Sequence, residues 1–214
     1  MGNVIPGVVG RDGFPLPDDS RDPGESPTAS WTDQGPIGLD AGGDAAKASL
    51  KITGWPRNIT WDEFKELSAR PSGENEDAQI HSEVDQPSEV AVVRESGIYR
   101  VTSLTVTIRT VTEDDWVVTS QKSAELLSHE QGHYDITGLM GRDMGKEIVA
   151  ARASSKDDLQ TKVTQIIEKY AQRAKDLSAQ YDDETNHGRN RDAQKKWNDR
   201  IHSAMQSGAR FTAP

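Results

Sequence analysis

The residues best suited to catalysis lie in one short stretch that reads H-E-x-x-H, from His129 through Glu130 to His133. In a helix, residues four apart project from the same face, so the two imidazoles can bind one Zn²⁺ ion. The glutamate between them then lies beside the metal, where its carboxylate can accept a proton. The pattern predicts a zinc site with two histidine ligands and a general base. The alternative is a chance pentapeptide whose histidines are ordinary helix residues.

The residues around the motif predict a helix from about Gln121 to Ala151, with Thr119 or Ser120 as its N-cap. Helix-forming residues precede the motif, and apolar residues follow it at spacings of three and four. Those that continue the face of the two histidines are Ile136, Met140, Met144 and Ile148. We therefore expect this face of the helix to point into the protein.

The same helix carries a stripe of three glycines, Gly138, Gly141 and Gly145. Each costs about 1 kcal/mol relative to alanine in a helix interior, so a packing reason is expected. The expected reason is the close approach of a second helix, which Ser155 caps and which covers residues 159–181. Its apolar stripe consists of Leu159, Val163, Ile166, Tyr170, Leu177 and Tyr181.

A hydrolytic zinc site usually has three protein ligands and a fourth position for water, so a third ligand is needed. The remaining histidines are His81, His187 and His202. His187 follows the second predicted helix and precedes Gly188, where the chain can break. In a continuous helix it would lie about 240° from Tyr181, off the apolar stripe. Either the helix unwinds there or His187 is a solvated surface residue and not a ligand.

Composition limits the classes of protein and of site. Cysteine is absent from the 214 residues, so a zinc ion here would need nitrogen and oxygen ligands. No apolar run reaches the roughly 18 residues of a membrane span. The net charge is −10, and residues 1–97 hold 18 acidic against 8 basic residues, whereas residues 98–214 hold 17 of each. An acidic half repels phosphate backbones, which argues against a nucleic-acid partner.

Residues 1–44 contain nine of the 18 glycines and six of the 10 prolines, and they are poor in apolar residues. This composition predicts a disordered arm, with Trp31 as its one candidate anchor. The first twenty residues lack the apolar stretch of a secretory signal, so no localisation is indicated beyond a cytoplasmic default. We expect one domain over residues 45–206 and a flexible tail over 207–214.

The first part of the domain begins with a strand at residues 48–53, where apolar and polar residues alternate. Thr60 and Glu63 have the spacing of a capping box, which predicts a short helix from Trp61 to about Ala69. Residues 71–88 are polar and are interpreted as a loop.

Strand signals return after this loop. Residues 90–93 and 98–111 alternate on either side of a turn and predict a hairpin, and residues 116–119 predict a last short strand. A small antiparallel sheet followed by long helices is expected, which is an α+β fold.

The order of several segments resembles a bacterial family of predicted secreted zinc-dependent proteases, over roughly residues 47–205. The segments are Trp61-Asp-Glu-Phe64, Trp116-Val117, Leu-Leu-Ser-His-Glu-Gln-Gly-His-Tyr-Asp-Ile at 126–136 and Tyr-Asp-Asp-Glu-Thr-Asn-His-Gly at 181–188, with Gln194 and Trp197. The resemblance implies a zincin-like core in which His129 and His133 bind zinc and Glu130 is the base. It also marks a second functional block, Tyr181, Asp182, Thr185, His187 and Gly188, and so favours His187 as the third ligand.

Together these observations give the hypothesis of an α+β, zincin-like zinc metallopeptidase that acts on peptide or protein substrates. Tyr181 is the candidate hydrogen-bond donor to the oxyanion, with a core tyrosine as the alternative. Asp183 or Glu184 can orient His187, and Asp182 joins them as a reserve candidate for the third ligand. An extended substrate can pair with the strand at 116–119.

Two other classes of protein remain open. One is a non-catalytic binding module whose helices are held by zinc, which would have four protein ligands and no water. The other is a metal-free helical interaction protein, whose melting temperature would not respond to a chelator. The sequence indicates neither an oligomeric state nor a membrane partner.

Overall fold

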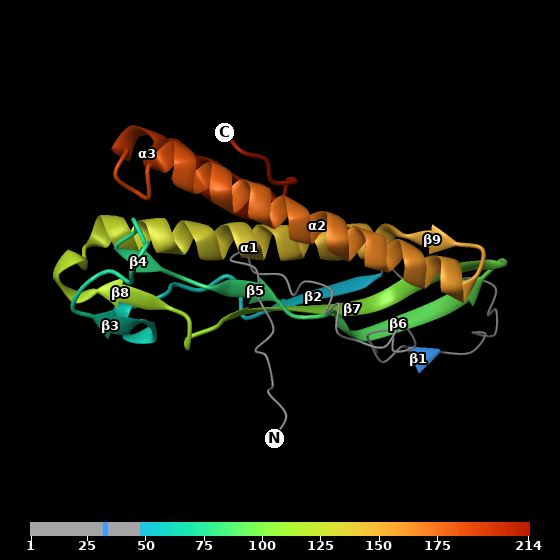
Figure 1. Ribbon diagram of the computed structural model, residues 1–214. Coiled ribbons are helices and arrows are strands. Elements are labelled where there is room, and N and C mark those ends of the chain that lie inside the picture. Colours follow the sequence, from blue (N-terminus) through green and yellow to red (C-terminus); the bar gives the residue numbers. More distant parts are fainter. Residues whose placement is uncertain (1–31, 34–47) are drawn as a thin grey trace, which may run out of the picture.

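The computed structural model describes residues 32–33 and 48–214, and they form a layered α+β fold. The central element is α1 (Ala124–Ala150), with β-sheets against one side and α2 (Lys156–Thr185) and α3 (Arg191–Ser207) against the other (Figure 1). Because it is covered on both sides, 16 of its 27 residues are buried. A helix buried in this way can hold a functional group away from solvent.

The larger sheet is built on the predicted hairpin, which is confirmed as β6 (Ser88–Glu95) and β7 (Ile98–Thr110). The predicted first strand is also present, as β2 (Ser49–Thr53), but it runs parallel to β7. The sheet is therefore mixed and not antiparallel as predicted. Alternation in a sequence fixes the two faces of a strand and not its direction, and the long connection between β2 and β7 permits the parallel arrangement.

Three short strands complete this sheet, and one of them lies in the predicted arm. They are β1 (Thr32–Asp33), parallel to β6, and β5 (Ser82–Val84) and β9 (Arg152–Ala153), both antiparallel to β7. The rest of the arm predicted at residues 1–44, including Trp31, lies outside the described residues.

A second sheet of three strands lies beside the start of α1. It contains β3 (Lys65–Leu67), β8 (Trp116–Val118) and β4 (Ala78–Gln79), in the order β3-β8-β4. The strand predicted at 116–119 is thus confirmed. It has neighbours on both edges, so it cannot accept the substrate strand that was predicted to pair with it.

Two predictions between residues 60 and 88 are wrong. The capping box of Thr60 and Glu63 forms, but the helix is one 3₁₀ turn, Trp61–Glu63, and not a helix to Ala69. Phe64 is extended and buried, and β3 pairs with β8 from the next residue onward, so tertiary packing overrides the helix signal. Residues 71–88 are not a loop throughout, because they contain β4 and β5.

The helices agree more closely with prediction. The N-cap of α1 is Ser123 and not Thr119 or Ser120 as predicted, because residues 119–121 form a 3₁₀ turn. The Ser123 side chain accepts a hydrogen bond from the Leu126 N–H. Ser155 caps α2 as predicted. Of the predicted apolar stripe on α2, Ile166 is partly buried and the other members are buried.

The glycine stripe of α1 does not contact a second helix, which corrects that prediction. A Cβ atom at Gly141 would lie 2.6 Å from the Cδ1 atom of Ile108, and one at Gly145 would lie 2.6 Å from the Cδ1 atom of Leu50. At Gly138 it would meet the ring of Trp55. The stripe therefore lets the bulky side chains of the sheet region pack close to the helix.

The C-terminal segment is not the flexible tail that was predicted for residues 207–214. Phe211 is fully buried, and its N–H donates to the Oδ2 atom of Asp143 on α1 at 2.8 Å. Its carbonyl oxygen accepts a hydrogen bond from Arg173 on α2 at 2.6 Å. The burial of Phe211 and these backbone hydrogen bonds tie the segment to both neighbouring helices. Among the described residues, no helix is long and apolar enough to cross a membrane.

Candidate metal centre

The two histidines of the motif lie on one face of α1, as their spacing predicts. His129 is 2% exposed, and its Nε2 atom lies 3.2 Å from the Nε2 atom of His133. The other ring nitrogens are held by side chains of the neighbouring helices. His129 Nδ1 lies 3.1 Å from Gln194 Oε1 on α3, and His133 Nδ1 lies 2.9 Å from Ser178 Oγ on α2. Both Nε2 atoms therefore face the same point between α1 and α2.

At that point lies the carboxylate of Asp182, near the end of α2. Its Oδ1 atom is 3.1 Å from His129 Nε2 and 2.9 Å from His133 Nε2. Burial opposes ionisation of this carboxyl group, but the two imidazoles hold its pKa well below the usual range. Burial would lower the pKa of His133, but the Asp182 charge raises it to about 9. Burial lowers the pKa of His129.

His187 joins this group because α2 ends at Thr185. Asn186, His187 and Gly188 have φ angles of 48°, 52° and 77°, which are left-handed conformations that turn the chain back over α1. A Cβ atom at Gly188 would also lie only 3.0 Å from the Cβ atom of His129. For His187 to approach the motif, the predicted helix had to unwind before it. In the structure α2 does end at Thr185, two residues before His187.

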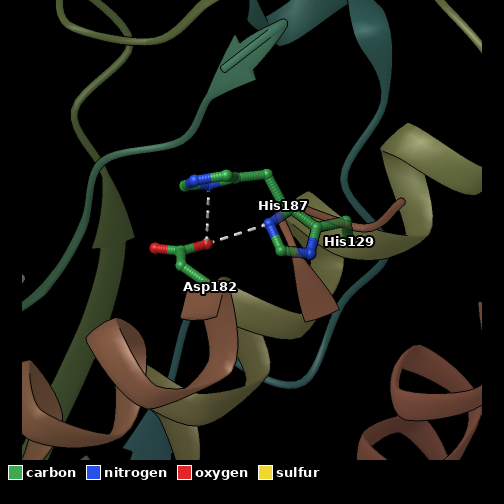
Figure 2. A group of neighbouring side chains, drawn as sticks. All are labelled: His129, Asp182 and His187. Carbon is green, nitrogen blue, oxygen red and sulfur yellow. Dashed lines mark hydrogen bonds and ion pairs between the residues drawn. The ribbon is translucent and has the colours of Figure 1, made fainter. Parts of the chain in front are cut away.

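The ring of His187 points toward Asp182, as Figure 2 shows. Its Nδ1 atom is 3.5 Å from Asp182 Oδ1 and 3.6 Å from Glu76 Oε1. This nitrogen is buried and makes no hydrogen bond within the part of the chain that the structure describes. Potential ligand atoms of His129, Asp182 and His187 all lie within 4.8 Å of one another.

These distances fit a metal ion. Zinc–nitrogen bonds of about 2.0–2.1 Å in a tetrahedron place neighbouring ligand atoms about 3.3 Å apart. The Nε2 atoms of His129 and His133 are separated by 3.2 Å, and Asp182 Oδ1 lies 2.9–3.5 Å from one nitrogen of each of the three histidines. A buried ring nitrogen without a hydrogen bond is a further sign that a partner is needed. His129, Asp182 and His187 form a group that could hold a metal ion, and His133 lies against two of its members.

Glu130 lies beside this group, in the wall of a small cavity of about 60 Å³. Its Oε2 atom accepts a hydrogen bond from the Ile80 N–H, at 3.0 Å, just after β4. Burial raises the pKa of Glu130 to about 8. The cavity is lined by Glu76, Gln79, Ile80, Glu130, His133, Ser178 and Asp182. The arrangement can take up a proton next to the proposed metal position.

Tyr181 does not have the position predicted for an oxyanion donor. It is fully buried, its ring stacks on that of His129 with centroids 4.6 Å apart, and its hydroxyl group donates to the carbonyl oxygen of His129 at 3.1 Å. The hydroxyl hydrogen therefore points away from the cavity. The alternative interpretation, a core tyrosine, agrees with this geometry.

Neither acid predicted to orient His187 lies in a position to do so. Asp183 is exposed, and Glu184 accepts a hydrogen bond from the Trp197 indole N–H at 2.8 Å. Glu76, which the sequence did not single out, approaches His187 together with Asp182. Sequence reasoning also missed Ser178, although Ser178 and Asp182 share one face of α2 at a spacing of four.

Comparison with known proteins places the chain in a family. Residues 60–188 match a family described as "Bacterial protein of unknown function (DUF922)". The matched range includes His129, Glu130, His133, Asp182 and His187. Comparisons with curated proteins and with solved structures gave no match. Because the match covers more than half of the chain, this protein belongs to that bacterial family of unknown function.

Proposed function

We propose that this protein is a zinc-dependent peptidase with a zincin-like core. The observation that carries the proposal is the convergence of three histidine nitrogens on one oxygen of Asp182, beside the buried carboxylate of Glu130. The matched family has no known function, so the proposal rests on the chemistry of these side chains.

The proposed ligands are His129, His133 and His187, with Asp182 at the fourth corner of the site. Asp182 lines the cavity, whose volume of about 60 Å³ leaves room for water beside this corner. We assign the corner at Asp182 as the position that would be open to the reacting water if a metal ion were bound, because a hydrolytic site needs one exchangeable position. The two motif histidines keep their orientation through Gln194 and Ser178.

Zn²⁺ in such a site supplies Lewis-acid chemistry, polarising a carbonyl group and lowering the pKa of water toward neutrality. Glu130 accepts the proton of the attacking water and delivers it to the leaving amine. The Ile80 N–H holds Oε2 of this carboxylate, and we assign the proton transfer to Oε1. The positive charge of a bound metal ion would favour the ionised form of Glu130. This would lower the pKa of Glu130 and oppose the effect of burial, which raises it.

One observation favours a second candidate, a binding module that zinc stabilises without catalysis. With Asp182 in place, the cluster offers four protein ligand atoms, which is the number typical of structural zinc sites. The two candidates differ in whether Asp182 leaves the metal when a substrate arrives.

The deciding experiment is Glu130→Gln, compared with Glu125→Gln, which changes an exposed residue on the same helix. Zinc content is measured by elemental analysis, and hydrolysis is measured with a broad peptide library. We expect Glu130→Gln to keep stoichiometric zinc and to lose at least about 100-fold in hydrolysis, because the base is removed and no ligand is lost. Glu125→Gln should match the wild type in both measurements.

Undiminished turnover by Glu130→Gln would contradict the peptidase proposal. If the wild type binds zinc but cleaves no peptide, the binding module is the better assignment.

A further inference from the structure

Gln194 lies in the second turn of α3, beyond the matched range of 60–188, and contacts the candidate metal centre. It is 8% exposed, and its Oε1 atom lies 3.1 Å from the Nδ1 atom of His129. Its Nε2 atom donates to Asn198 Oδ1 at 2.8 Å and to the hydroxyl oxygen of Tyr181. The amide therefore connects His129 to a network of buried polar groups.

The direction of each hydrogen bond in this network follows from one fixed acceptor, the carbonyl oxygen of His129. Tyr181 must donate its hydroxyl hydrogen to that oxygen, so the hydroxyl group can only accept from Gln194. The group of Gln194 that faces Tyr181 is then the NH₂ group, and the group that faces His129 is the carbonyl oxygen. His129 must then donate from Nδ1, so Nε2, which faces Asp182 Oδ1 at 3.1 Å, is the nitrogen left to bind a metal ion.

We propose that Gln194 is a positioning residue that fixes the tautomer and the ring orientation of His129 for metal binding. An imidazole with its proton on Nδ1 binds a metal through Nε2. In His129 this Nε2 atom faces Asp182 and His133. Through this contact, α3 is part of the metal centre. The inference rests on the proposed zinc site for its purpose, but the tautomer of His129 is measurable without any metal.

Two substitutions separate positioning from a merely structural role. Gln194→Glu keeps an acceptor for His129 and loses the donors to Tyr181 and Asn198. Gln194→Met has a similar length and loses both the acceptor and the donors. A structural role predicts equal damage from the two changes, whereas positioning predicts damage from the methionine alone. Asn198→Ala is the control, because it removes a partner of the NH₂ group and leaves the acceptor intact.

Zinc affinity is measured by competition with a chromogenic chelator, and the His129 tautomer is measured by ¹⁵N NMR of the metal-free protein. For Gln194→Met we expect about 10–100-fold weaker zinc binding and loss of the Nδ1–H tautomer as the single form. For Gln194→Glu and Asn198→Ala we expect affinity within about threefold of the wild type and an unchanged tautomer.

Equal losses in Gln194→Met and Gln194→Glu would overturn the inference, and so would unchanged affinity and tautomer in Gln194→Met. If the wild type binds no zinc, the proposed function fails. The NMR comparison still decides whether Gln194 sets the tautomer of His129.

Discussion

The two halves of α1 differ in what buries them. In the first half, His129 and Glu130 are polar groups held by side chains and backbone from α2, α3 and the end of β4. In the second half, Leu139, Met140 and Met144 are fully buried in the apolar core. Burying polar groups costs free energy unless each has a partner. The second half therefore supports the fold, and under the proposed function the first half holds the metal.

The largest effect is expected from a substitution that disturbs only the metal site on the first half of α1. His187→Ala removes a proposed ligand, so zinc affinity should fall by at least about 100-fold, and zinc should lose much of its effect on the melting temperature. His202→Ala, an exposed histidine on α3, is the matched control. Isothermal titration and thermal melting with and without zinc give both quantities. Unchanged zinc affinity would exclude His187 as a ligand and leave Asp182 as the third.

Sequence reasoning could find the first half of α1 because H-E-x-x-H is a local pattern. At His187 it left two alternatives open, an unwound helix or a solvated surface residue, and in the structure the helix ends at Thr185. It could not rank Asp182 above Asp183 and Glu184, because only the docking of α2 on α1 decides which acid meets the histidines. The roles of Gln194 and Glu76 likewise depend on contacts between segments far apart in the chain.

The fold was predictable to the extent that its signals are local. The hairpin of β6 and β7 and the caps and stripe of α2 follow from alternation, spacing and capping residues. By contrast, β4 and β5 are too short to show a period, and they are buried because β8 and β7 pair with them. The glycine stripe correctly indicated a close approach, but a glycine does not reveal whether a helix or a sheet side chain fills the space.

The next expected effect concerns the chain segment that supports the first half. The Ile80 N–H donates to Glu130, and the next N–H, of His81, donates to Asp115. Burial raises the pKa of Asp115 from 3.8 to about 7. At pH values well below 3.8, this carboxyl group is protonated in both the folded and the unfolded state. As the pH rises toward 7, the unfolded chain ionises first, so the group's contribution to stability is lost across this range.

Asp115→Asn should remove this loss. Its free energy of unfolding, relative to the wild type, should rise between pH 4 and pH 7 by at most about 4 kcal/mol and stay level above pH 7. Urea titrations at a series of pH values measure the difference. Glu113→Gln, which changes an exposed acid two residues away, is the control and should run parallel to the wild type. If the free energy of unfolding of Asp115→Asn differed from that of the wild type by the same amount at every pH, the pKa of Asp115 would not be raised in the folded protein.

The smallest effect is expected from a substitution that disturbs the packing of the second half of α1 and leaves the metal site intact. Gly141→Leu places a large side chain against the Cδ1 atom of Ile108 and the Cγ2 atom of Val84, where even a Cβ atom would lie at 2.6 Å and 3.2 Å. Overpacking of this kind costs about 1–3 kcal/mol in the free energy of unfolding. Zinc stoichiometry should be unchanged, because Gly141 is two turns beyond His133.

Gly145→Ala is the matched control for this change. Its Cβ atom would meet the end of the Leu50 side chain, which is only partly buried and can move, so the better helix propensity of alanine offsets the contact. Denaturant unfolding and zinc analysis of the two variants test whether the second half of α1 supports stability independently of the metal site on the first half. A loss of zinc in Gly141→Leu without a loss of stability would mean that the two halves are not independent. An unchanged unfolding curve would mean that the sheet moves away from the helix at little cost.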